Sequence, residues 1–81
     1  MELSEFNRNS VPKRAEIVWD SGSMLCVRCT DDASVLLYNM GKFFAEVWYN
    51  PAMNNIIYVK GFKSINCLEP YLELISLDDL N

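Results

Sequence analysis

The chain contains no histidine, and this absence removes several kinds of active site at once. Neither a Ser-His nor a Cys-His nucleophile can be assembled, and the residue that most often binds metals in proteins is missing. The three glycines, at positions 22, 41 and 61, are too far apart to form a phosphate-binding loop. We therefore predict a protein that is not an enzyme and that carries no cofactor.

Basic residues are scarce as well. Seven Lys and Arg stand against eleven Asp and Glu, which gives a formal net charge of −4. Nucleic-acid binding depends mainly on the neutralisation of phosphates, and the seven cations do not form a stripe that could do this. Every charged residue after Lys63 is acidic. The composition therefore argues against a nucleic-acid partner.

Long apolar runs are missing too. No stretch approaches the roughly 20 apolar residues that a membrane-spanning helix needs, and the acidic start of the chain has no signal-peptide pattern. The three cysteines are an odd number, which fits free thiols in a reducing compartment better than a disulfide framework. We expect a cytoplasmic protein with no membrane contact.

The chain does contain enough apolar material for one small domain. Of its 81 residues, 51% are hydrophobic and 22% are charged, which is the ordinary range for a globular protein. Residues 1–9 show no period, and we expect a loose N-terminal segment there. Residues 10–81 form the predicted single domain.

The strongest structural signal is a β-hairpin between Phe43 and Phe62. Two runs rich in aromatic and β-branched residues flank the turn-forming cluster of residues 50–55. Two earlier runs, residues 24–30 and 35–39, have a similar composition, and a short turn separates each run from the next. Connections this short join antiparallel neighbours, because a parallel crossover needs about a dozen residues or more. The prediction is a four-stranded antiparallel meander.

A helix is predicted before the strands. Ser10 has the chemistry of an N-cap, Pro12 suits the first turn, and Gly22 suits the position just past the end. A strand is the alternative, because residues 15, 17 and 19 also alternate and residues 20–22 could make a hairpin turn. The apolar residues at helical spacing are Val11, Ala15, Val18 and Trp19.

A second helix is predicted near the C-terminus. Ser64 or Asn66 can cap it, and Pro70 requires the regular part to begin near Glu69. The fold class that follows is α+β, with the N-terminal and C-terminal helices packed on one face of the four-stranded sheet. The apolar stripe of the second helix would comprise Leu68, Tyr71, Leu72 and Ile75.

This arrangement leaves the other face of the sheet for a partner. Two short helices cannot cover both faces, yet the second face keeps large aromatic side chains. We predict a module that works by protein contact, with self-association into a homodimer through this face or a sheet edge as the simplest case. The residues expected at the contact are Phe44, Glu46, Trp48 and Tyr38. An alternative function is small-ligand binding in a pocket between helices and sheet, near Trp19, Trp48 and Tyr71.

A metal or redox module is a further alternative, because Cys26-Val27-Arg28-Cys29 is a C-x-x-C motif and Cys67 adds a third thiol. Zinc would need another ligand, such as Asp31 or Asp32, or a second chain. On a strand, however, residues three apart point to opposite faces, and this geometry suits neither a metal nor a disulfide. We favour cysteines that act as small buried hydrophobic residues.

The second half of the chain resembles a group of short uncharacterised bacterial proteins of similar length. The residues that carry the resemblance are the segment 37–49, then Phe62-Lys63-Ser64 and Leu68-Glu69-Pro70-Tyr71-Leu72. In that group an apolar hairpin leads to a Leu-Glu-Pro-Tyr-Leu helix. The resemblance implies a bacterial cytoplasmic setting and no known activity, and it carries over no functional residues.

Overall fold

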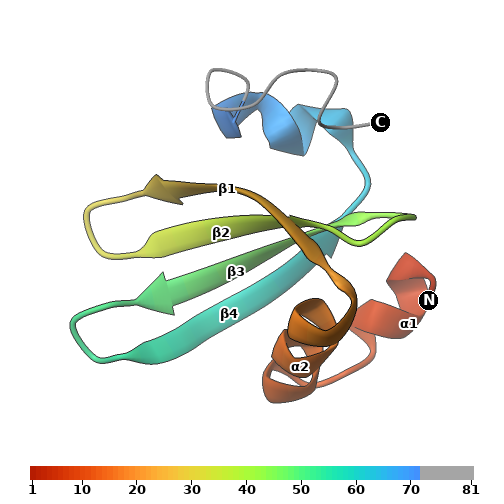
Figure 1. Cartoon of the computed structure of the whole chain (residues 1–81), viewed down its shortest axis with the longest axis horizontal. Helices are drawn as coiled ribbons and strands as arrows, with labels where there is room; N and C mark the ends of the chain where they lie inside the picture. The colour runs from red at the N-terminus through yellow and green to blue at the C-terminus, as the bar shows by residue number, and fades with distance from the viewer. Residues whose placement is uncertain (72–81) are drawn as a thin grey trace.

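Four antiparallel strands form one sheet in which neighbours along the chain are also neighbours in space, in the order β1-β2-β3-β4 (Figure 1). The structure is a computed structural model, and it describes residues 1–71. The predicted α+β class with a four-stranded antiparallel meander is confirmed. The strands are β1 (Ser23–Cys29), β2 (Ser34–Asn39), β3 (Phe44–Asn50) and β4 (Asn55–Phe62).

Polar side chains close the turns between these strands. The hydroxyl of Thr30 accepts a hydrogen bond from the amide of Ala33 at 3.1 Å in the first turn. The carboxamide of Asn39 accepts one from the amide of Gly41 at 2.8 Å in the second, where Gly41 has a φ of +92° that favours glycine. In the third turn the carboxamide of Asn50 accepts two backbone amides. Such local bonds favour turns over continued strands.

Helix α2 (Val11–Ser21) precedes the sheet, so the helical prediction is confirmed over its strand alternative. The hydroxyl of Ser10 accepts a hydrogen bond from the amide of Lys13 at 3.4 Å, and Gly22 caps the other end. Of the apolar residues at helical spacing, Ala15 and Val18 are buried, whereas Trp19 is 59% exposed. No helix within residues 1–71 is long and apolar enough to cross a membrane.

Helix α1 (Leu3–Asn7) lies where the sequence predicts a loose segment. The carboxylate of Glu5 accepts a hydrogen bond from the amide of Glu2 at 3.3 Å, which closes the first turn. Phe6 is completely buried, and its ring centroid lies 5.0 Å from that of Phe43. Two apolar residues cannot display a period, so contact with the sheet, rather than local pattern, explains this helix.

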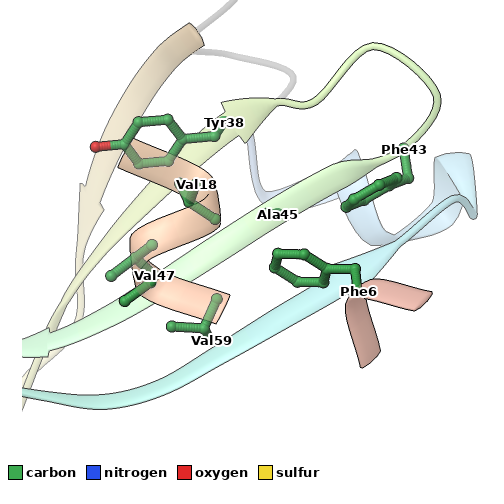
Figure 2. Packing of buried hydrophobic residues seen from close by; sticks show 8 residues of the cluster. Phe6, Val18, Tyr38, Phe43, Ala45, Val47 and Val59 are labelled. Carbon is green, nitrogen blue, oxygen red and sulfur yellow. The ribbon is translucent and has the colours of Figure 1, made fainter. Parts of the chain in front are cut away.

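One face of the sheet is covered by α1 and α2. Phe6 and Val18 pack there against Ala45 and Val47 of β3 and Val59 of β4 (Figure 2). Along β3, Ala45 and Val47 alternate with Phe44, Glu46 and Trp48, which belong to the opposite face because side chains alternate along a strand. The N-terminal helices therefore bury only one of the two apolar sets on β3.

The opposite face is covered by η1 (Ile65–Tyr71), a 3-10 helix that contains Pro70. Leu68 and Tyr71 are buried there in a second hydrophobic cluster with Val35, Leu37 and Phe62. The prediction that both terminal helices pack on one face is therefore wrong. Its physical reason is the apolar character of both strand faces, which makes burial of each face favourable. The predicted stripe residues Leu72 and Ile75 lie outside the described part of the chain.

Candidate functional site

The structure brings three of the four predicted contact residues together. Phe44, Glu46 and Trp48 share the face that η1 covers, and Phe44 and Trp48 are half-buried against the second cluster. Tyr38 pairs with Ala45 across β2 and β3, so its side chain belongs to the α2 face, where it is buried. The surface predicted to be open is thus largely filled, and Tyr38 is not part of it.

Glu46 is the buried charged residue of this face, with 5% of its surface exposed. The hydroxyl of Tyr71 donates a hydrogen bond of 2.5 Å to its Oε2 atom. A nitrogen of the Arg28 guanidinium lies 3.5 Å from the same oxygen. Lys60 is opposite Glu46 in the register of β3 and β4. A buried carboxylate needs such partners, because an unpaired charge in the interior is costly.

Arg28 extends the cluster with two aromatic contacts. Its guanidinium lies 5.3 Å from the ring centroid of Trp48 and 5.1 Å from that of Tyr71, within the range of cation–π attraction. Burial, together with the hydrogen bond to Glu46, raises the pKa of the Tyr71 phenol above its ordinary value. The carboxylate and the phenol are therefore engaged with each other, and the cluster joins β1, β3 and η1. We assign it a structural role.

A cleft of about 510 Å³ opens beside this cluster, between the sheet and η1. Lys60 and Glu69, of opposite charge, both line it, as do Cys67 and Pro70. Charges of both signs and a lining that is neither mainly polar nor mainly apolar give no preference for one class of ligand. The cleft is consequently a weaker candidate than the groove described below.

The cysteines are separated as the strand geometry predicts. Cys26 pairs with Leu37 and Cys29 with Ser34, so they face opposite sides of β1. Cys26 and Cys67 are half-buried against the second cluster, and burial raises the pKa of the Cys26 thiol. Cys29 is exposed, so the expectation that it is a buried hydrophobic residue is wrong.

Residues 1–71 contain no group of three His, Cys, Asp or Glu side chains that could hold a metal ion.

A larger hollow lies on the other side of the sheet, between α2 and the strands. Its volume is about 610 Å³, and apolar side chains make most of its surface. Of the three residues named for the predicted ligand pocket, Trp19 forms part of the wall of this hollow, whereas Trp48 and Tyr71 lie on the opposite face. We call this hollow the α2 groove. Its lining residues are Val11, Pro12, Ala15, Trp19, Leu36, Val47, Tyr49, Asn54, Asn55 and Ile56.

The floor of the α2 groove continues to the edge of the sheet. Val27 of β1 pairs with Leu36 of β2, which pairs with Val47 of β3, so the three side chains form one row on the α2 face. Val27 is 44% exposed. Tyr49 and Ile56 form the next row. The apolar surface therefore extends from β4 to β1, with Trp19 standing over it.

The sequence predicts a pocket near Trp19 but not the other residues that line the α2 groove, although one signal for them existed. Val11, Ala15 and Trp19 are spaced four residues apart, and such a line drifts around a helix away from the stripe that contains Val18. The edge of the apolar stripe is where a helix passes from core to surface. The spacing does not predict the position of α2 on the sheet. That position determines how much of the apolar strand surface in the groove stays uncovered.

The comparisons with known proteins give no family. No protein-family model matches the chain, and neither a curated protein nor a solved structure matches it. The function must therefore be argued from the surfaces of the molecule itself.

Proposed function

We propose that this protein is a non-enzymatic interaction module that binds a segment of another protein in the α2 groove. The observation that carries the proposal is the groove itself, an apolar hollow of about 610 Å³ with the exposed indole of Trp19 on its wall. Aromatic side chains beside apolar pockets are typical anchors of protein contacts. Exposed apolar surface of this kind on a small domain is a reason to expect a partner.

The proposed contact surface differs from the one that the sequence suggests. Phe44 and Trp48 pack against η1 and are only partly exposed, whereas Trp19 and Val27 are exposed. A homodimer that pairs two α2 grooves is one form of the proposal, and sedimentation at micromolar concentration would detect it. The three free cysteines support a reducing compartment, for which we propose the cytoplasm.

A titration with a designed peptide tests the proposal. The probe is an 18-residue amphipathic helix of Leu and Gln, which carries an apolar face without charge. We expect its addition to shift the amide NMR signals of Leu36, Val47 and Tyr49, because these residues line the groove. Shifts confined to the η1 face, or no shifts at millimolar peptide, would contradict the proposal.

A pair of matched variants makes the test specific. Trp19→Ser removes the exposed wall of the groove, and Ile65→Ser removes an even more exposed apolar side chain from η1 on the opposite face. Both substitutions leave the buried core intact. We expect Trp19→Ser to weaken peptide binding and Ile65→Ser to leave it unchanged. Equal effects of the two would place the contact elsewhere.

Binding of a small apolar ligand is the second candidate, and the size of the groove favours it. Ligand pockets typically enclose about 300–1,000 Å³ and are lined mainly by apolar side chains. The hydroxyl of Tyr49 and the carboxamide of Asn54 are hydrogen-bonded to each other at one end, where they could orient a polar group. Binding of an uncharged solvatochromic dye that Trp19→Ser abolishes, together with no peptide binding, would favour this candidate.

A further inference from the structure

The charges around the α2 groove point to the kind of segment that it holds. Resting on the proposed function, we infer that the partner is a short amphipathic segment of another protein in which Lys or Arg residues flank the apolar face. Three features of the surface support it: the charges of the exposed side of α2, those of the β1–β2 turn, and the positions of Lys13, Arg14, Arg28, Lys42 and Lys60.

The exposed side of α2 next to Trp19 has an excess of one negative charge. Lys13, Glu16, Trp19 and Asp20 line one hollow, which adjoins the α2 groove through Trp19. The ammonium of Lys13 lies 3.4 Å from the carboxylate of Glu16, so these two charges compensate each other. Asp20 then adds an exposed carboxylate to the hollow that Trp19 also lines. One margin of the groove is therefore negative.

A second acidic margin lies at the end of the sheet. Asp31 and Asp32 are exposed in the turn between β1 and β2. That turn follows the row in which Ser34 pairs with Tyr49 and Tyr49 with Ile56, and the last two residues line the groove. The apolar floor thus runs between carboxylates on α2 and carboxylates on the turn.

Four of the cations on the strands, helices and turns have partners, or belong to a sheet face, away from the α2 groove. Arg14 donates hydrogen bonds to the carbonyl oxygens of Val59 and Asn7, at 3.0 and 2.6 Å. Arg28 is engaged with Glu46 on the η1 face, and Lys42 pairs with Glu2 at 2.7 Å. Lys60 belongs to the η1 face because it is opposite Glu46. Lys13 is the cation that lines a hollow adjoining the groove.

This distribution selects among the possible occupants. A second copy would bring the same carboxylates to the interface, and like charges that face each other disfavour a complex. An anionic membrane surface would be repelled for the same reason. A segment with apolar residues between Lys or Arg would place its apolar side on the floor and its cations at the two acidic margins. Complementary charges would also accelerate its association.

Three designed peptides of one helical pattern separate the inference from the proposed function. They contain Leu with Lys, Leu with Gln or Leu with Glu, and their binding to the intact chain is measured by amide NMR shifts at low and high salt. We expect the Leu/Lys peptide to bind about tenfold more tightly than the Leu/Gln peptide, and the Leu/Glu peptide most weakly. The preference should shrink as salt rises, because salt screens exposed charges.

Matched variants assign the preference to the acidic margins. The double variant Asp31→Asn with Asp32→Asn should weaken Leu/Lys binding about threefold and leave Leu/Gln binding unchanged. Glu69→Gln removes an exposed carboxylate from η1 and serves as control. Equal affinities for the Leu/Lys and Leu/Gln peptides in the groove would overturn the inference and leave the proposed function standing. Absence of binding by all three peptides would overturn both. Formation of a homodimer through the groove, or binding to anionic vesicles that Trp19→Ser abolishes, would also overturn the inference.

Discussion

The hydroxyl of Tyr71 donates a 2.5 Å hydrogen bond to the buried carboxylate of Glu46, across 25 positions of the chain. This bond fastens η1 to the middle of β3. Tyr71 is fully buried, and the Arg28 guanidinium lies at cation–π distance from its ring and from that of Trp48. The second face of the sheet thus has a polar contact at the centre of its hydrophobic cover.

Removal of this hydroxyl should destabilise the fold. We expect Tyr71→Phe to lower the free energy of unfolding by about 2 kcal/mol, because a hydrogen bond to a charged group is lost and Glu46 remains buried. Urea denaturation at neutral pH measures the change. Tyr58→Phe is the matched control, since Tyr58 is largely exposed. A loss no larger than that of the control would show that the bond contributes nothing to stability.

The same contact predicts a loss of stability in alkaline solution. Burial and the bond to Glu46 raise the pKa of Tyr71 in the folded state above the value of about 10 that an unfolded chain has. The unfolded state therefore loses this proton at lower pH than the folded state does. The contribution of Tyr71 is complete up to about pH 9 and decreases as pH rises through about 10 and beyond.

Comparison with Tyr71→Phe isolates this contribution. Urea denaturation of both proteins at pH 8, 9, 10 and 11 should show a stability difference that is constant up to about pH 9 and shrinks above it. Other groups titrate in this range, but they are common to the two proteins. A difference that grows with pH would contradict the prediction.

The cysteines should differ in reactivity according to their surroundings. Cys29 is exposed, whereas burial raises the pKa of the half-buried Cys26 thiol and so lowers the fraction present as reactive thiolate. We expect iodoacetamide to modify Cys29 first, with Cys26 slower by about tenfold or more at pH 7.5. Peptide mass spectrometry over time measures both rates, and the urea-unfolded chain, in which the two rates should be similar, is the control. Equal rates in the folded protein would contradict the assignment of Cys26 to the second cluster.

The elements that the sequence predicts correctly are those with local causes. Ser10, Pro12 and Gly22 determine where α2 begins and ends through bonds within a few residues, and the polar turns define the four strands. The class of the fold follows from the short connections alone. The face on which each helix packs does not, because it depends on the path of the chain after β4 and on which apolar set is left uncovered.

The candidate site was predictable only in part for the same reason. Glu46 lies between two aromatic residues in the sequence, which marks a special position. Its partner Tyr71, however, is 25 residues away and belongs to η1, the element that was predicted on the wrong face of the sheet. The α2 groove depends on the offset of α2 across the strands. Helix α1 is the extreme case, since Leu3 and Phe6 have no local pattern and meet their partners only in the folded chain.

Gly61 of β4 provides a test of this last point. A Cβ atom added there would lie 2.7 Å from the Cδ1 atom of Leu3 and 2.8 Å from the ring of Phe6, closer than ordinary contacts allow. Gly61→Ala should therefore push α1 away from the sheet and lower the free energy of unfolding by about 1–3 kcal/mol. In a chain that already carries Leu3→Ala, the cost should be smaller because one of the two obstacles is gone. Urea denaturation of the four proteins of this double-mutant cycle measures the coupling. Gly61→Ala with no cost, or with the same cost in both backgrounds, would mean that Leu3 of α1 does not pack against β4.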